Sequence, residues 1–213
     1  MKLYSYFRSS AAYRVRIALA LKNLPFETEY VSLLKNGGEH KQVAYAARNP
    51  QKLVPTLEDQ GAFLTQSLAI VEYLDEIYPE NPLLPADALG RARVRALAQL
   101  IACDTHPLNN LRVLQYLQNQ LGADETAKNA WYAHWIHENF VALETLLQNP
   151  QTGRFCHGNV PTLADCCLVP QVYNARRFNI DLGAYPTIVR IADECDTLPA
   201  FIAAAPENQA DAA

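Results

Sequence analysis

The sequence has no excess of positive charge. Lysine and arginine together number 18 against 22 aspartates and glutamates, which gives a formal net charge of -4 at pH 7. A protein that follows the phosphates of DNA or RNA needs a basic stripe on its surface, and this composition offers no surplus from which to build one. We therefore predict that nucleic acid is not a partner of the protein.

Long apolar runs are also missing. No such run approaches the ~20 residues that span a membrane, and the opening MKLYSYF is interrupted by Arg8 too soon to be a secretory signal. The five cysteines are odd in number and lack CxxC spacing, which favours reduced thiols over disulfides or metal ligands. These absences predict a soluble, cytoplasmic protein without a membrane partner or a metal.

What the sequence does contain is enough apolar material for a packed core, since 50% of its 213 residues are hydrophobic. The pattern changes at YPENPLLPADA, residues 78–88, where prolines and small polar residues concentrate. Strand and helix patterns alternate before this stretch, and helical periodicity alone follows it. We predict an α/β domain over residues 1–79, a linker over 80–87 and an all-helical domain over 88–213.

The first of these domains is expected to contain strands of period two and helices of period 3.6. The short runs TLED and AFLT, separated by Gln60-Gly61, predict a hairpin. The remaining expected elements are a strand over 2–7, a helix over 11–23, an extended run over 26–34, a short helical piece near 40–47 and a helix from Ser67.

The second domain is expected to be a set of long helices. Residues 88–121 and 124–148 each repeat apolar positions at helical spacing, and Pro107 is expected to bend the first. A third helix is expected at Thr162, where Thr162 and Asp165 form an S/T-x-x-D capping box that we assign to folding. A last helix is expected near Pro186, followed by a frayed tail, ENQADAA.

Three short stretches place polar groups where an element begins. Ser9 and Ser10 stand at the predicted start of a helix, whose unpaired N–H groups and partial positive charge favour an anion. Val54-Pro55 precedes a strand, where a cis proline would leave the backbone of Val54 free to pair with an extended ligand. Gln66-Ser67 opens another helix that is suited to hold a carboxylate. Together the three stretches indicate a peptide-like anionic ligand.

Each stretch has a plainer explanation when it is taken alone. Serine is a preferred N-cap in any helix, so capping by itself accounts for Ser9 or Ser10. A simple turn by itself accounts for Val54-Pro55. The ligand hypothesis depends on the joint presence of the three stretches in one small domain.

The stretches RSSAAYRVRIALALK, NPQKLVPTL, QSLAIVEYL and TLADCCLVPQVYNARRF closely resemble the zeta class of glutathione transferases, over nearly the whole chain. The resemblance implies a thioredoxin-like N-terminal domain, an all-helical C-terminal domain, glutathione as cofactor and a homodimer. Within the class, the chain most resembles the cis-trans isomerases that convert maleylpyruvate to fumarylpyruvate in aromatic degradation of the gentisate type. Maleylacetoacetate, the substrate of tyrosine breakdown and one methylene longer, is the alternative.

By this resemblance the nucleophile is not part of the chain. The thiolate of glutathione adds reversibly to the double bond of a small dicarboxylate, rotation follows, and elimination restores the thiol. Ser9 is expected to donate a hydrogen bond to the thiolate, with Ser10 as a second catalytic residue. The class motif reads serine-serine-cysteine, and this sequence has Ala11 in the third position, so a mechanism that uses a protein cysteine there is excluded.

The resemblance also supplies candidates for binding. The two carboxylates of the substrate call for arginine, whose planar fork matches a carboxylate. Arg8 and Arg176 are the first candidates and Arg112 is a weaker third. Adjacent helix positions point about 100° apart, so only one of Arg176 and Arg177 is expected to face a cleft. The candidates for glutathione are Ser9, Ser10, Ala11, His40, Val54, Gln66, Ser67, His106 and Asn110.

Some of these residues have equally simple structural roles. His40 is expected to reach the glycyl carboxylate of glutathione, whereas His106, next to Pro107, is as well explained by a core or surface position. Arg14 and Arg16 are expected to form salt bridges along their helix and not to bind a ligand.

Two other functions remain open from the residues. One is a general glutathione transferase that conjugates electrophiles, and the clamping arginines argue against it because typical electrophiles for conjugation are apolar. The other is a non-catalytic binding module that uses the transferase fold for dimerisation or docking. The joint presence of Ser9, Val54-Pro55 and Gln66-Ser67 argues against that second alternative.

Overall fold

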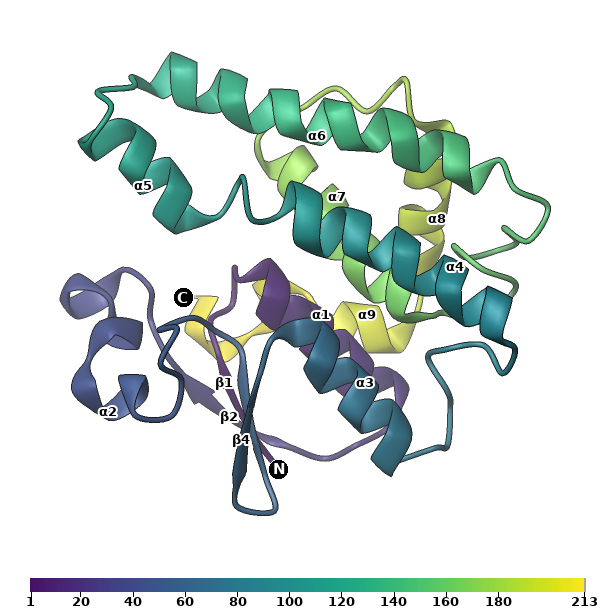
Figure 1. Cartoon of the computed structure of the whole chain (residues 1–213), viewed down its shortest axis with the longest axis horizontal. Helices are drawn as coiled ribbons and strands as arrows, with labels where there is room; N and C mark the ends of the chain where they lie inside the picture. Colours follow the sequence, from purple (N-terminus) through teal and green to yellow (C-terminus); the bar gives the residue numbers. More distant parts are fainter. Residues whose placement is uncertain (213) are drawn as a thin grey trace. The chain divides into compact units, whose positions relative to one another are not determined.

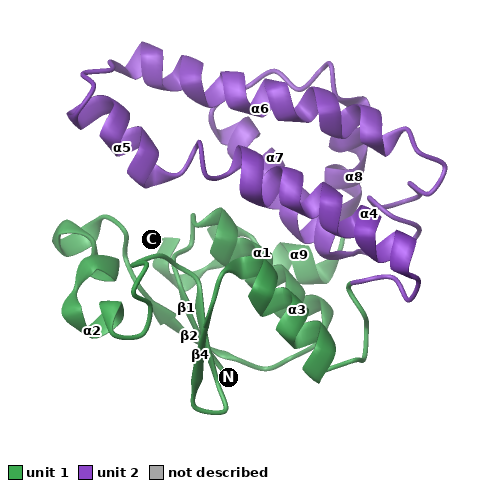
Figure 2. Cartoon of the chain, viewed as in Figure 1, with its two compact units in different colours: residues 1–83, 197–213 green, residues 84–196 purple. Residues whose placement is uncertain are grey.

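The computed structural model describes residues 1–212, and the chain forms two compact units (Figure 2). Unit 1 comprises Met1–Leu83 and Thr197–Ala213, and unit 2 comprises Leu84–Asp196. The domain boundaries inferred from the sequence stay a prediction. The compact units differ from them at the C-terminal end, because the segment that begins at Thr197 groups with unit 1.

Unit 1 is built on a sheet of four strands in the order β2-β1-β3-β4. The pair β1 and β2 is parallel, whereas β3 is antiparallel to both β1 and β4. The hairpin predicted from TLED and AFLT is confirmed, and Gln60 and Gly61 at its turn both have positive φ. The strands are β1 (Lys2–Ser5), β2 (Glu27–Tyr30), β3 (Thr56–Asp59) and β4 (Ala62–Thr65).

The helices of unit 1 include one that the sequence patterns did not predict, α9, which packs against α1. The tail expected to be frayed forms short 3-10 turns over its described residues. The elements are α1 (Ser10–Leu21), η1 (Lys35–Gly37), η2 (Glu39–Lys41), α2 (Val43–Ala46), α3 (Ser67–Ile77), α9 (Pro199–Ala204), η4 (Pro206–Asn208) and η5 (Ala210–Ala212).

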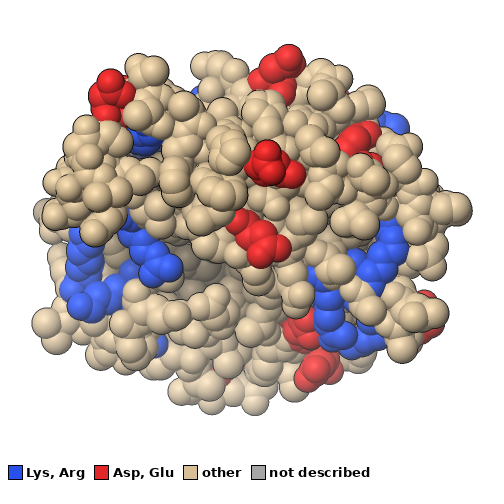
Figure 3. Space-filling view, turned by 45° about the horizontal axis from the view of Figure 1, so that its top comes forward, with Lys and Arg blue, Asp and Glu red and all other residues tan. Residues whose placement is uncertain are grey.

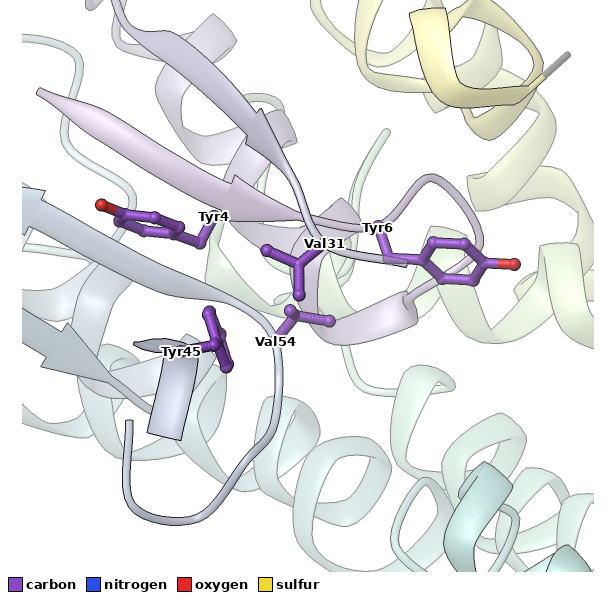
Figure 4. Close-up of a cluster of buried hydrophobic side chains, with 5 residues drawn as sticks. All are labelled: Tyr4, Tyr6, Val31, Tyr45 and Val54. Carbon is purple, nitrogen blue, oxygen red and sulfur yellow. The ribbon is translucent and has the colours of Figure 1, made fainter. Parts of the chain in front are cut away.

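Side chains of the sheet alternate between two cores. Leu3 of β1 and Leu57 of β3 are directly opposite and fully buried. Their face of the sheet is covered by α1 and α3 (Figure 1). The other face, on the side of α2, carries a cluster of buried side chains: Tyr4, Tyr6, Val31, Tyr45 and Val54 (Figure 4). This mixed sheet between two helical layers confirms the thioredoxin-like architecture.

Unit 2 is all-helical. Its elements are α4 (Ala88–Gln99), the π-helical segment η3 (Leu100–Thr105), α5 (Leu111–Asn119), α6 (Glu125–Leu147), α7 (Leu163–Arg177) and α8 (Pro186–Asp196). Within residues 1–212, none of the helices combines the length and apolar character needed to cross a membrane.

The prediction of a continuous helix over 88–121 is wrong, because the backbone leaves α-helical geometry after Gln99. The N–H of His106 donates to the carbonyl of Ile101 at 2.9 Å, which is the wider i→i+5 pattern. Pro107 follows and has no N–H with which to continue a helix. The predicted bend is therefore a complete interruption between α4 and α5.

The capping box expected at the start of α7 is present. The carboxylate of Asp165 accepts hydrogen bonds from the N–H of Thr162 at 2.7 Å and from that of Cys156 at 2.8 Å. Burial raises the pKa of Asp165, and the hydrogen bonds from Cys156 and Thr162 oppose that rise. This arrangement ties the loop before α7 to its first turn, as expected for a folding role.

Candidate functional site

The strand register brings three predicted stretches to one edge of the sheet in unit 1. Tyr4, near the end of β1, pairs with Thr56 at the start of β3, and Thr56 pairs with Thr65 at the end of β4. The loop after β1, the residues before β3 and the residues after β4 therefore share this edge. They are Ser9-Ser10, Val54-Pro55 and Gln66-Ser67.

Ser9 is the N-cap of α1. Its backbone is extended, at φ -70° and ψ 114°, and its Oγ accepts a hydrogen bond from the N–H of Ala12 at 3.2 Å. A hydroxyl that accepts in this way still carries a hydrogen to donate. Ser10 is buried in the first turn of α1. The capping role of Ser9 is confirmed, and donation from its hydroxyl to a ligand at the helix N-terminus stays a prediction.

The peptide bond between Val54 and Pro55 is cis, as predicted. Within residues 1–212, no hydrogen bond uses the N–H or the carbonyl of Val54. The preceding carbonyl, of Leu53, accepts from the Tyr45 hydroxyl at 2.6 Å and from Asn49 Nδ2 at 2.7 Å. The turn is thus fixed from the interior while the peptide groups of Val54 stay unpaired.

Tyr45 belongs to the cluster of buried side chains under this turn (Figure 4). Its hydroxyl also lies 2.9 Å from Thr56 Oγ1. Burial raises the pKa of Tyr45, so the phenol stays protonated at neutral pH and keeps a hydrogen to donate. The cluster therefore connects the packing of the sheet to the position of Val54.

Gln66 immediately precedes α3 and has φ 68° and ψ 112°. Such a positive φ is uncommon for a residue other than glycine and is concentrated at functional sites. Ser67, the first residue of α3, is 6% exposed, and its Oγ accepts from Arg14 Nη1 at 3.2 Å. This bond connects the start of α3 to α1 and brings a guanidinium to a helix N-terminus.

Two further candidates of unit 1 lie on loops. Arg8 is exposed and lies over the ring of Phe7, with its Cζ 4.8 Å from the ring centroid. His40 folds back on Gly38, because a Cβ added to Gly38 would lie 2.5 Å from His40 Cε1. Burial lowers the pKa of His40, and a hydrogen bond to the backbone of Ser32 acts in the opposite direction. Binding of a carboxylate by His40 stays a prediction.

In unit 2, His106 and Asn110 lie together at the start of α5. Asn110 caps this helix, since its Oδ1 accepts from the N–H of Arg112 at 3.1 Å. Its Nδ2 lies 3.5 Å from His106 Nε2. Arg112 is exposed and forms no ion pair among the described residues. The structure thus groups three of the four candidates of unit 2.

The fourth candidate, Arg176, is engaged elsewhere. At the end of α7 it forms ion pairs with Asp193 and Asp196 of α8. Its neighbour Arg177 lies over the ring of Phe178, at 4.4 Å from the centroid. Burial raises the pKa of Tyr132 to about 12, against a hydrogen bond from Arg177. The two adjacent arginines have separate partners, as the angle between helix positions predicts.

Comparison with known proteins extends over the whole chain. Residues 3–82 match the family model of the glutathione S-transferase N-terminal domain. The chain is 52% identical to a probable maleylacetoacetate isomerase of Vibrio cholerae serotype O1, covering 99% of this chain and 97% of that protein. It is also 52% identical to the maleylpyruvate isomerase of a Ralstonia species, with 100% of both chains covered.

Solved structures of related proteins agree with these sequence comparisons. The holo structure of a maleylpyruvate isomerase, described as a bacterial zeta-class glutathione S-transferase, superposes with a TM-score of 0.97 at 52% identity, covering 100% of both chains. The chain belongs to the zeta class of glutathione transferases. A maleylacetoacetate isomerase from Anaeromyxobacter dehalogenans, solved with bound dicarboxyethyl glutathione and citrate, is 47% identical with a TM-score of 0.88, covering 100% of this chain and 97% of that chain.

This zeta-class chain contains supporting residues that sequence reasoning missed. Arg14, expected in a salt bridge along its helix, donates a hydrogen bond to Ser67 Oγ, which the sequence did not predict. For Arg16 the same expectation is wrong, because its guanidinium is buried and its acceptors are three carbonyls and the Ser5 hydroxyl. Tyr45 and Asn49 hold the turn before β3. Among these four supporting residues, only Asn49 had a local signal in the sequence, which is the turn at Asn49-Pro50.

Proposed function

We propose that this zeta-class transferase is a glutathione-dependent isomerase that converts maleylpyruvate to fumarylpyruvate. The unpaired peptide groups of Val54, at the same sheet edge as Ser9, carry the proposal. They provide a donor and an acceptor for an extended peptide, and Ser9 provides a hydroxyl that is suited to hold a thiolate. The names of the full-length relatives support the same reaction.

Glutathione fits the residues of unit 1. Val54 would pair with the peptide backbone of the tripeptide, and Gln66 and Ser67 at the start of α3 would hold a carboxylate. Ser9 and Ser10 would lie with the N-terminus of α1 at the sulfur, and His40 would reach the remaining carboxylate. Ala11 offers no competing thiol, and His106 and Asn110 of unit 2 are further candidates for contact.

Glutathione, when bound, would supply a thiolate for reversible addition to the double bond of the substrate, which would permit rotation about that bond. A free thiol has a pKa of about 8.5 and is largely protonated at neutral pH. Lowering that pKa by one or two units needs roughly 1.4 to 2.8 kcal/mol. A hydrogen bond from Ser9 and the positive end of α1 together reach this magnitude.

The carboxylates of the substrate need cations. Arg8 in unit 1 and Arg112 in unit 2 are both exposed and form no ion pair among the described residues. Arg176 is already paired with Asp193 and Asp196 and would have to exchange these partners to bind a substrate. The ligand named in the related structure, dicarboxyethyl glutathione, joins glutathione to a group with two carboxyls, which supports a dicarboxylate as the substrate class.

Maleylacetoacetate is the second candidate substrate. The probable maleylacetoacetate isomerase of Vibrio cholerae has the same identity to the chain as the Ralstonia maleylpyruvate isomerase. The two substrates differ by one methylene, which is worth about 1 to 3 kcal/mol in a pocket that selects by size.

The resemblance also supports a homodimer in the cytoplasm, and we include both the dimer and this location in the proposal.

The surface drawn in Figure 3 carries lysine and arginine as well as aspartate and glutamate, and neither sign of charge covers that face. On this face the mixture lacks the continuous basic stripe that a long polyanion needs.

The test is a spectrophotometric comparison of maleylpyruvate and maleylacetoacetate with and without glutathione. We expect turnover of maleylpyruvate that requires glutathione and leaves its total thiol unchanged. Stoichiometric loss of thiol would indicate a conjugating transferase. Turnover without glutathione would contradict the mechanism, and failure to bind glutathione in calorimetry would indicate a non-catalytic binding module.

A further inference from the structure

The loop Tyr6–Ser9 joins β1 to α1 and carries Arg8 and Ser9, two residues of the proposed site. One hydrogen bond closes the loop on itself, from the N–H of Ser9 to the carbonyl of Tyr6 at 3.0 Å. The peptide groups of Phe7 lie inside this turn. Their N–H and carbonyl need partners from elsewhere in the chain.

Those partners come from two distant parts of unit 1. The carbonyl of Phe7 accepts from Arg16 Nη2 of α1 at 3.0 Å. The N–H of Phe7 donates to Asp211 Oδ2 of η5 at 3.0 Å, across a separation of 204 residues. Phe7 is therefore held on one side by the helix that follows it and on the other by the C-terminal segment.

Arg16 is the interior part of this support. It is 2% exposed, and besides Phe7 its guanidinium donates to Ser5 Oγ at 3.1 Å and to the carbonyl of Ala204 at 2.9 Å. Burial lowers the pKa of Arg16 to about 10, while Tyr13 and Asp211 act in the opposite direction. The guanidinium thus stays charged at neutral pH and joins the loop to α9.

Asp211 has few other partners. Its Oδ1 is buried and has no hydrogen-bond partner among the described residues. The carboxylate therefore interacts with the N–H of Phe7 and with the charge of Arg16. A buried carboxylate oxygen without a partner costs free energy, so packing alone does not account for this residue.

We propose that Asp211 is a positioning residue of the site, which acts through the Phe7 N–H on the loop that presents Arg8 and Ser9. The inference rests on the proposed function, because the position of Ser9 affects the reaction only if Ser9 holds the thiolate. A shift of about 1 Å in such a group costs up to about 100-fold in rate. Loss of Asp211 is therefore expected to act on kcat more than on KM.

The experiment uses three variants of the full chain. Asp211→Ala removes the acceptor and the charge, whereas Asp211→Asn removes the charge and keeps an acceptor. Glu207→Gln is the matched control, because Glu207 lies in the same segment, is exposed and has no partner among the described residues. Hydrogen exchange of the Phe7 amide is measured without glutathione, and kcat and KM are measured with it.

We expect Asp211→Ala to speed exchange of the Phe7 amide and to lower kcat by about tenfold, with KM within about twofold. Asp211→Asn should recover part of kcat, and Glu207→Gln should match the unmodified protein. Unchanged exchange at Phe7 in Asp211→Ala would overturn the proposal, and so would a lower melting temperature with unchanged kcat.

The two proposals fail differently. If the unmodified protein turns over neither substrate, the proposed function is wrong, and exchange at Phe7 still reports whether Asp211 holds the loop. If the unmodified protein is active and Asp211→Ala keeps its full kcat, the proposed function stands and the positioning role is wrong.

Discussion

The candidate residues of unit 1 and of unit 2 differ in how they are supported. In unit 1 the candidates at the sheet edge are backbone groups and hydroxyls, whereas Arg8 and His40 lie on loops. The arginines that hold the sheet-edge groups, Arg14 and Arg16, are each 2% exposed. In unit 2 the candidates for binding a carboxylate are long side chains at the surface, and the side chain of Arg176 is 42% exposed.

This difference separates two kinds of recognition. A peptide group fixed from the interior has one orientation before a ligand arrives, so it recognises a ligand by position. An exposed arginine loses roughly 2 kcal/mol of rotamer entropy when it is fixed and attracts an anion chiefly by charge. Changes at the sheet edge of unit 1 should therefore alter stability and rate, and changes at the exposed arginines, which include those of unit 2, should alter substrate affinity.

The largest effect is expected for Arg16→Met. Four acceptors lose their donor, so we expect the free energy of unfolding to fall by roughly 3 kcal/mol or more, measured by urea denaturation. Arg48→Met is the control, because Arg48 donates to the carbonyl of Ala44 and lies over the ring of Tyr4, and its loss should cost about 1 kcal/mol. Equal midpoints for both variants would remove the distinction between interior and surface support.

Ser9→Ala tests the hydroxyl at the start of α1. We expect kcat to fall by about 100-fold, since a hydrogen bond to a charged group is lost. Loss of the cap also destabilises α1 by about 0.5 to 2 kcal/mol. Ser9→Gly separates the two effects, because glycine costs a cap only a few tenths of a kcal/mol. A Ser9→Gly variant with normal kcat would show that capping is the only role of Ser9.

Arg112→Ala and Arg176→Ala sharpen the comparison within unit 2. We expect Arg112→Ala to raise KM for the dicarboxylate by about tenfold with a smaller change in kcat. Arg176→Ala should have less effect, because its guanidinium is paired with Asp193 and Asp196.

Asp193→Asn tests the alternative that Arg176 binds the substrate. If Arg176 binds the substrate in competition with these carboxylates, steady-state kinetics should show a lower KM for Asp193→Asn than for the unmodified protein. An unchanged KM would leave Arg176 as a link between α7 and α8.

The smallest effect is expected for His40, in the pH dependence of the free energy of unfolding. Burial lowers the pKa of this imidazole in the folded state, so below its unfolded pKa of about 6.5 the unfolded chain binds more protons. The free energy of unfolding should therefore fall more steeply between about pH 7.5 and pH 5 in the unmodified protein than in His40→Gln. Parallel denaturation curves for the two proteins would contradict the burial of His40.

Local signals in the sequence predicted most of the framework. The hairpin around Gln60, the cis bond before Pro55 and the capping box of Thr162 each depend on a few adjacent residues, and the structure has all three. The break before Pro107 was predicted only as a bend, because helical periodicity continues through residues that adopt π-helical geometry.

The supports of the site were not predictable in the same way. Arg16 and Ala204 are 188 residues apart, and Phe7 and Asp211 are 204 residues apart. In the sequence an arginine on a helix is most simply explained by a nearby carboxylate, and a short polar tail by fraying. Only tertiary contacts distinguish these alternatives from a buried network.

The return of the chain to unit 1 after residue 196 has a consequence for biosynthesis. While a ribosome has yet to release the segment that begins at Thr197, Arg16 lacks the carbonyl of Ala204 and Phe7 lacks the carboxylate of Asp211. The unit that emerges first is therefore completed last, after all of unit 2 has been translated.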